Sequence, residues 1–444
     1  MREPLRLVRS APRPAARPRA ADALELIALA AGIALALSLA AALPSWRTDL
    51  GRFQALAAVA FAFWALALAR RHRWQALPHA GAAVVVVAFV LRAAVLGTSP
   101  SLSDDVYRYV WEGRVLAAGH DPWREPPRSP ALAPLRDAAI WPRVNHPDLR
   151  TLYPPLAEAG FALVARVSPT VAAMKLWIAL HDLALCALLA WWCGRAGPDG
   201  RGRPLDAIVY AWNPLPVIEY AGSGHHDPTA LVWLVLALAV RDTRPLLSAL
   251  ALAAGALVKL VPLLALPFLW ARWPWRARLA ALAVLAAGLA FFGLETRGAG
   301  SGLDAFATTW RDNDSLFALL AATLGDRRAR LAAAAIVAAV IAWALRRRQG
   351  APRGTRAAAR AMLVAGPVMH PWYLGWPLVL EPLAPSPPWL LLGFTALLDY
   401  GTLAPPAAGG AYHPTVAARA LEYGLPLALA AVLALGARRR AGGR

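Results

Sequence analysis

Two adjacent aspartates, Asp104 and Asp105, open an amphipathic stretch that carries Arg108 one helical turn later. A carboxylate can accept the proton of an attacking hydroxyl group, and a nearby cation can stabilise a departing phosphate. The same pair could instead cap a helix that begins at Val106, because Asp is a favoured N-cap residue that stabilises the positive end of the helix dipole. The residue types therefore leave two roles open, a general base or a helix cap.

A second motif places Glu219 one turn before His225, His226 and Asp227. Glycines between them allow a ligand to approach the backbone closely. Adjacent histidines do not easily point at one ion from a helix, so we expect hydrogen bonds to a sugar or phosphate rather than a metal site. Helix capping by Asp227 is the structural alternative. An acid inside an apolar span, such as Glu219, usually faces a cavity or a cation.

Lys259 is one of only two lysines in a chain whose usual cation is arginine. A lysine among apolar residues needs an anion, for which a lipid phosphate is suitable, unless its side chain extends to the membrane interface. His370 and Tyr373, in the sequence HPWY, could donate to the same phosphate, although Trp and Tyr are also common at membrane interfaces. Further substrate-binding residues are predicted at polar or aromatic positions of the same kind: Tyr107, Glu112, Tyr153 and Asn313.

The elements that must position these groups are predicted from composition. Of 444 residues, 59% are hydrophobic and 16% are charged, against about 45–50% and about 25% in soluble domains. Apolar runs recur along almost the whole chain, which excludes an ordinary soluble enzyme and predicts an all-α polytopic membrane protein with roughly 11–13 spans. The formal charge of +20 is mostly a topology signal, because more than half of the Lys and Arg residues fall in loops of one side. We therefore expect no nucleic-acid partner.

The loop charges place both termini in the cytoplasm. We predict a disordered basic tail over 1–21, a single transmembrane domain over 22–436, and a basic tail over 437–444. An extracytoplasmic loop with interfacial helices is expected over 98–170, including a helix over 156–167. The segment 245–270 is bracketed by arginines and is too short to cross twice, so it should break near Lys259 and Pro262. The predicted spans include 171–193, 206–222, 228–240 and 371–384, and Asn213-Pro214 should disturb the helix of the second of these.

The polar residues named above fall at, or just beyond, the predicted outer ends of the spans. The strings SLSDDVYRYVWEGRVLAAGHDPW, NHPDLRTLYPP, WNPLPVIEYAGSGHHDP, KLVPLLALP, WRDNDSLF and MHPWYLGWPL occur in that order. In this order they resemble the bacterial polyprenyl-phosphate-mannose-dependent members of the GT-C glycosyltransferases, which are related to the catalytic subunit of the first GPI mannosyltransferase. The resemblance runs from about Leu91 to Leu398.

This resemblance implies a GT-C-like bundle in the bacterial inner membrane with an extracytoplasmic active site. It implies inverting transfer of a hexose, most simply mannose, from a polyprenyl-phosphate donor to a glycolipid or glycan acceptor. In the family, the first outward loop begins with an acidic motif whose Asp is taken as the base. Asp104 matches best and Asp105 second, although the acids here are adjacent rather than spaced as D-x-D. Arg108, Lys259, His370 and Tyr373 would hold the donor phosphate. No cofactor is implied, and a divalent metal is not indicated.

Two other classes of function remain open from the sequence. A lipid or solute transporter would also be polytopic, but it should carry ionisable groups near the bilayer midplane and have related halves. A non-catalytic partner of an envelope-glycan machine could share the glycosyltransferase shape without the activity.

Overall fold

The computed structural model describes residues 20–195, 202–298, 300–403 and 416–442. The predicted tail over 1–21 lies almost wholly outside these residues. Helices make up the described part of the chain, in which no strand is found. The all-α class predicted from composition is therefore confirmed. The last helix continues to Gly442, so most of the segment predicted as a basic tail over 437–444 is helical.

Among the described residues, six helices are long and apolar enough to cross a membrane, as expected for a polytopic membrane protein. They are α1 (Ala20–Ala41), α2 (Leu50–Trp74), α6 (Val171–Cys193), α12 (Trp275–Glu295), α15 (Asp326–Arg346) and most of α19 (Val416–Gly442). Shorter helices complete the bundle: α3 (Ala80–Leu96), α9 (Pro228–Val240), α10 (Pro245–Val258), α14 (Leu316–Leu324), α16 (Ala351–Ala365) and α18 (Pro387–Thr395). Three further helices are α4 (Asp105–Ala117), α5 (Pro155–Val167) and α13 (Gly302–Thr308).

Two of the predicted spans are divided into short helices. The stretch 206–222 is divided into η3 (Pro204–Ala207), α7 (Ile208–Ala211), α8 (Pro214–Pro216) and η4 (Val217–Gly222). Its break lies at Asn213, whose backbone is extended because the following proline disfavours the helical region. The stretch 371–384 is likewise divided into η6 (Pro371–Leu374), α17 (Gly375–Leu378) and η7 (Glu381–Leu383), and η8 (Ala396–Leu403) follows α18.

The predicted break near Lys259 is present. Helix α10 ends at Val258, Lys259 has an extended backbone, and the chain continues through η5 (Val261–Ala265) and α11 (Leu266–Trp270). A proline inside the turn cannot donate a backbone hydrogen bond, so a helix does not continue through it. The break leaves the Lys259 side chain at a bend rather than on a helix face.

One group of buried polar side chains links three helices of the bundle. The Arg92 Nε atom on α3 lies 2.8 Å from Asp182 Oδ2 on α6. The Tyr210 hydroxyl on α7 donates to the other Asp182 oxygen at 2.6 Å. Because unpaired charges are costly in a low-dielectric interior, this triad fixes α3, α6 and α7 relative to one another.

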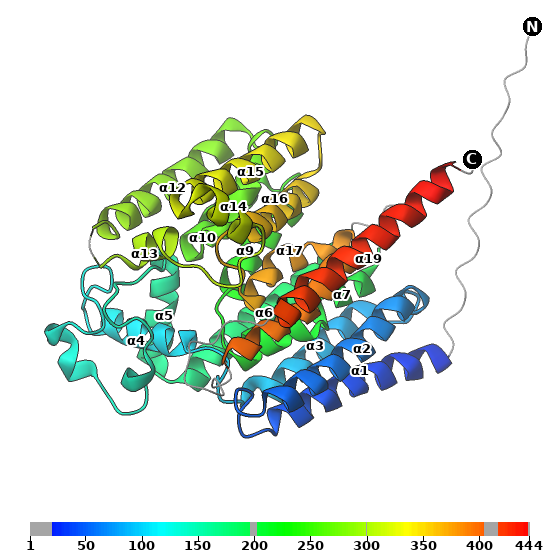
Figure 1. The fold of residues 1–444 in the computed structure, drawn as a ribbon, viewed down its shortest axis with the longest axis horizontal. Helices are drawn as coiled ribbons and strands as arrows, with labels where there is room; N and C mark the ends of the chain where they lie inside the picture. The colour runs from blue at the N-terminus through cyan, green and yellow to red at the C-terminus, as the bar shows by residue number, and fades with distance from the viewer. Residues whose placement is uncertain (1–19, 196–201, 299, 404–415, 443–444) are drawn as a thin grey trace, which may run out of the picture.

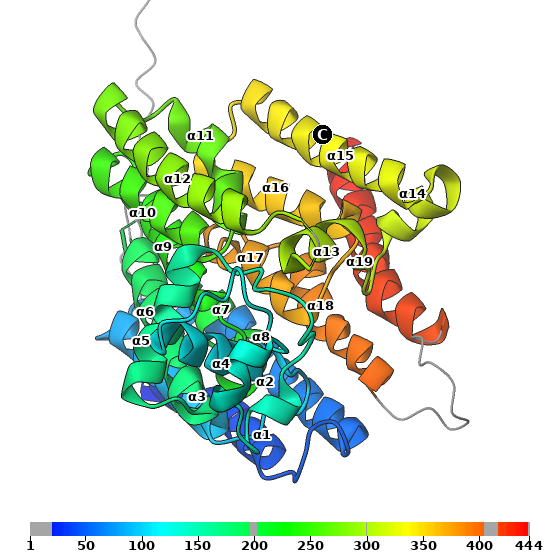
Figure 2. The ribbon, with the colours of Figure 1, turned by 90° about the vertical axis from the view of Figure 1, so that its left-hand side faces the viewer.

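Helices α4, α5 and α13 gather at one end of the molecule. They lie at the left in Figure 1 and face the viewer in Figure 2. Helix α1 begins, and α19 ends, at the opposite end.

Candidate functional site

A cavity of about 690 Å³ opens between α4, the long loop that follows it, the break at Lys259, α13 and the HPWY segment. Its lining includes the polar residues Asp105, Asn145, Asp312 and His370. It also includes apolar residues, among them Leu260, Leu264, Leu303, Phe306 and Met362. A cavity lined by both kinds of residue suits a ligand with a polar head and an apolar chain.

The two aspartates at the start of α4 occupy different environments. Asp105 lines the cavity, whereas Asp104 is not among the lining residues. The Asn145 side-chain amide donates to Asp105 Oδ1 at 2.9 Å, and His225 Nδ1 lies 3.4 Å from Asp105 Oδ2. Asp104 occupies the N-cap position but makes no side-chain capping hydrogen bond. Capping therefore does not account for the pair.

The surroundings shift the pKa values of these two carboxyl groups in opposite directions. Burial would raise the pKa of Asp105, but the contact with His225 and the proximity of His370 and Lys259 hold that pKa well below its ordinary value. Partial burial and the charge of Asp105 raise the pKa of Asp104, although Arg47 opposes them. Asp105 is thus the carboxylate that stays ionised and faces the cavity.

Arg108 lines the cavity, but its guanidinium is engaged by the protein. It forms an ion pair with Glu112 and donates to the backbone oxygens of Asn145 and His146 at 3.0 Å and of Leu149 at 2.7 Å. These bonds hold the loop that carries Asn145 against α4. Arg108 therefore supports the residue that contacts Asp105.

Glu112 belongs to a buried chain that reaches α5. The Thr151 hydroxyl lies 3.1 Å from Glu112 Oε2 and 2.7 Å from Glu158 Oε1. One hydroxyl hydrogen cannot serve two carboxylates, so one of the acids must be protonated. Burial and the nearby Glu112 raise the pKa of Glu158 well above its ordinary value. Glu158 is the neutral member, and the sequence analysis did not identify it.

Lys259 projects into the cavity from the break after α10. Its Nζ atom lies 2.6 Å from Asp227 Oδ1 and about 5 Å from the ring centres of Tyr373 and Trp376, at 5.0 and 5.4 Å. The Trp376 indole also donates to Asp227 Oδ1 at 2.6 Å. Lys259 and Tyr373 both line the cavity, so a cation enclosed by aromatic rings faces it.

The loop that carries the two histidines packs directly against α4. Gly224 has a φ of +86°, and a Cβ atom there would lie 3.1 Å from side-chain atoms of Val106 and Lys175. Glycine is suited to this close approach. The rings of His225 and Trp372 stack with 3.6 Å between centroids. His226 instead packs edge-on among Tyr109, Tyr153 and Phe161.

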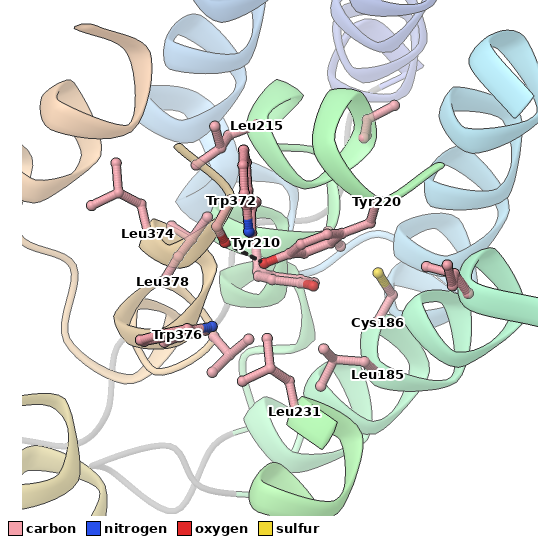
Figure 3. Close-up of a cluster of buried hydrophobic side chains, with 14 of the residues drawn as sticks. Leu185, Cys186, Tyr210, Leu215, Tyr220, Leu231, Trp372, Leu374, Trp376 and Leu378 are labelled. Atoms are coloured by element: carbon pink, nitrogen blue, oxygen red, sulfur yellow. Dashed lines mark hydrogen bonds between the residues drawn. The ribbon is translucent and has the colours of Figure 1, made fainter. Parts of the chain in front are cut away.

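The HPWY segment is fixed from behind by the hydrophobic core (Figure 3). The Tyr220 hydroxyl donates to the backbone oxygen of Trp372 at 3.0 Å. A side chain at Gly375 would overlap this hydroxyl, so glycine permits the contact. His370 stacks on Trp372 with 4.2 Å between ring centroids. The structure thus brings His370, Tyr373, Lys259 and Asp105 to one cavity.

Other residues predicted from the sequence lie elsewhere. Tyr107 contacts Arg143, and Glu219 accepts a hydrogen bond of 2.7 Å from Tyr400. Asn313 donates to Glu422 at 2.7 Å. These three, together with Glu112, His225, His226 and Asp227, are not among the residues that line the cavity, whereas Tyr153 is.

The cavity lining also includes Asp312, Asn145 and Trp310, which are not among the site residues predicted from the sequence. Asp312 is part of the string WRDNDSLF, and this position in a motif was the only signal that could have identified it. Among the described residues, no group of three or more His, Cys, Asp or Glu side chains could hold a metal ion.

These features define a polytopic helical membrane protein with a cavity lined by both polar and apolar residues. Residues 151–371 match the family model of Glycosyltransferase family 87. The match covers just under half of the chain, from the start of α5 through Lys259 and Asp312 to His370, and Asp105 precedes it. No curated protein and no solved structure gives a match. The family match supports a membrane glycosyltransferase.

Proposed function

We propose that this protein transfers a hexose, most simply mannose, from a polyprenyl-phosphate sugar to an extracytoplasmic glycolipid or glycan with inversion. The observation that carries the proposal is that one cavity presents an ionised carboxylate, Asp105, together with Lys259 and His370. Such a transfer needs a base that accepts the proton of the acceptor hydroxyl and groups that stabilise the departing phosphate.

The lining of the cavity supports a lipid-linked donor. Its apolar residues, which include Leu260, Leu264 and Met362, would contact the first part of the polyprenyl chain. Its polar residues would bind the phosphate and the sugar. A nucleotide would make no comparable use of the apolar residues.

In the proposed step, Asp105 accepts the proton of the acceptor hydroxyl while the oxygen of that hydroxyl attacks the anomeric carbon. A bond forms between these two atoms, and the bond from the anomeric carbon to the phosphate oxygen breaks. The electron pair stays on the phosphate oxygen, so lipid phosphate leaves with one more negative charge. Lys259, His370 and Tyr373 stabilise this charge, and the proton on Asp105 is released to water.

Two roles are assigned within the acidic motif. Asp105 is the base, because it faces the cavity and Asp104 does not line it. Arg108 holds the loop that carries Asn145, since its guanidinium is engaged by Glu112 and three backbone oxygens. Lys259 and His370 are then the residues that bind the donor phosphate.

We also propose the bacterial inner membrane as the location, with the cavity on the extracytoplasmic side. The arginine-rich loops mark the cytoplasmic side by the positive-inside rule. The start of α1 and the end of α19 lie at the end of the bundle opposite to α4 (Figure 1).

The test uses purified protein in liposomes with radiolabelled polyprenyl-phosphate mannose and a glycolipid extract as the acceptor. We expect labelled glycolipid and an equal amount of free polyprenyl phosphate. Donor binding without product would favour a non-catalytic partner, and protein-dependent movement of intact donor between leaflets would favour a transporter. Polyprenyl-phosphate glucose serves as the comparison for the sugar.

A further inference from the structure

Asp312 contacts one of the proposed phosphate ligands. Its Oδ2 atom lies 2.6 Å from His370 Nδ1, and both residues line the cavity. The Asp312 side chain is 45% exposed and that of His370 is 18% exposed. The carboxylate is therefore the more exposed member of this pair.

The backbone fixes Asp312 next to the segment that leads to His370. The Asp312 N–H donates to the Pro367 oxygen at 3.0 Å, and the Met369 N–H donates to the Asp312 oxygen at 3.0 Å. Asp312 and Val368 thus form an isolated parallel bridge. Because these two segments are held in register by backbone hydrogen bonds, the distance between the Asp312 carboxylate and the His370 imidazole does not depend on side-chain packing alone.

The plane of the His370 ring is fixed separately. It stacks on Trp372 at 4.2 Å with 13° between the planes, and it meets Tyr373 edge-on at 5.2 Å. With the ring plane held by stacking and Nδ1 held by Asp312, Nε2 on the other edge is the nitrogen left for a ligand.

We propose that Asp312 is a positioning residue that accepts the Nδ1–H of His370 and so presents Nε2–H to an anionic ligand. This inference rests on the proposed function, in which that ligand is the phosphate of the donor and of the departing lipid phosphate. An imidazole between a carboxylate and a phosphate can donate to both only as the imidazolium. Asp312 thus acts through His370 and does not touch the reacting atoms.

The charged and titratable groups around His370 come from several elements. Asp312 precedes α14, Asp105 begins α4, Asp399 lies in η8, and Lys259 lies across the Tyr373 ring. Asp312 is the one of these groups in direct ion-pair contact with the ring among the described residues.

The first test is a double-mutant cycle on the affinity for undecaprenyl phosphate. Asp312→Asn should weaken binding about tenfold, because the charge-assisted hydrogen bond that orients the imidazole is lost. In a His370→Gln background, Asp312→Asn should cause no further loss of affinity. Additive losses would overturn the proposal.

Two matched variants complete this test. Asp304→Asn, an exposed acid on the neighbouring helix α13, should bind like the wild type. Asp312→Glu should recover part of the loss, because it restores the charge. Equal losses in Asp304→Asn and Asp312→Asn would show a general charge effect and would contradict a role through His370.

A second measurement does not depend on the proposed function. In protein labelled with ¹⁵N-histidine, the resonances of His370, assigned with His370→Gln, should show hydrogen on Nδ1 in the wild type and a changed pattern in Asp312→Asn. If the wild type does not bind undecaprenyl phosphate but shows this pattern, the proposed function fails and the assignment of Asp312 stands. If the nitrogen resonances of His370 are the same in the wild type and in Asp312→Asn, the assignment of Asp312 is refuted.

Discussion

Trp372 and His225 stack face to face, with 3.6 Å between the ring centroids and 13° between the planes. Trp372 also stacks on His370 at the same angle. A single indole therefore holds one imidazole that contacts Asp105 and another that contacts Asp312. The two ends of the proposed reaction are linked through this side chain.

Replacing this indole should disturb both imidazoles. Aromatic pairs contribute about 0.5–1.5 kcal/mol each, so Trp372→Leu should lower kcat/KM by about tenfold to a hundredfold. Trp372→Phe should retain more activity, because a smaller ring can still stack. Trp64→Leu, which removes a buried indole outside the cavity lining, should lower thermal stability without this loss of rate. Equal kinetic effects at both positions would contradict the role of the stack.

Substitutions of the two aspartates at the start of α4 should have different effects on the rate of transfer. Asp105→Asn should lower the rate of transfer by about 10²–10⁴, the usual contribution of a general base. Asp104→Asn should keep most of the activity. Donor binding should survive in both variants and is measured by competition with undecaprenyl phosphate. The reverse ranking of the two rates would assign the base to Asp104.

His225 should set the acid limb of the pH–rate profile. The pKa of Asp105 is lowered by the contact with His225 against the effect of burial, so the carboxylate stays ionised in mild acid. Its stabilising contribution is present above its ordinary pKa and is lost as the pH falls through the lowered value. In His225→Phe, which can still stack on Trp372, the pKa of Asp105 should rise. The acid limb of kcat/KM should then move to higher pH, and an unmoved limb would exclude this contact as its cause.

Glu112 and Glu158 should respond oppositely to neutralisation. Glu158 has a raised pKa, so its folded form holds a proton that the unfolded chain releases above about 4.5, and stability falls as the pH rises through that window. Glu158→Gln should therefore be at least as stable as the wild type at pH 8. Glu112→Gln leaves Arg108 without its carboxylate and should cost about 3–5 kcal/mol. Thermal unfolding in detergent at pH 5 and 8 tests both, and a destabilised Glu158→Gln would show that Glu158 is the charged member.

Lys259 should have separable effects on stability and activity. Lys259→Gln alone leaves Asp227 charged and buried, which should cost about 3–5 kcal/mol. The double variant with Asp227→Asn should recover most of the thermal stability. It should not recover binding of undecaprenyl phosphate, because the cation remains absent. A double variant with wild-type affinity would exclude Lys259 as a phosphate ligand.

The sequence predicted individual breaks as well as the class of fold. The ends of the segments 171–193 and 228–240 agree with α6 and α9, and the breaks at Asn213 and Lys259 were predicted from proline and from flanking charge. The continuous span predicted over 371–384 was wrong, because apolar length does not show where a helix is interrupted. Its prolines were the available signal.

The sequence by itself determined that this is a helical membrane protein with polar motifs at the ends of its spans. Apolar length and loop charge are local properties, and a chain in lipid must satisfy its backbone hydrogen bonds internally. Only the tertiary structure decided which polar groups meet: that Asp105 faces the cavity, that Arg108 is engaged by Glu112, and that Asp312 reaches His370. The physical reason is that Coulomb and hydrogen-bond interactions act over a few ångströms, and the distances between remote segments are set by packing.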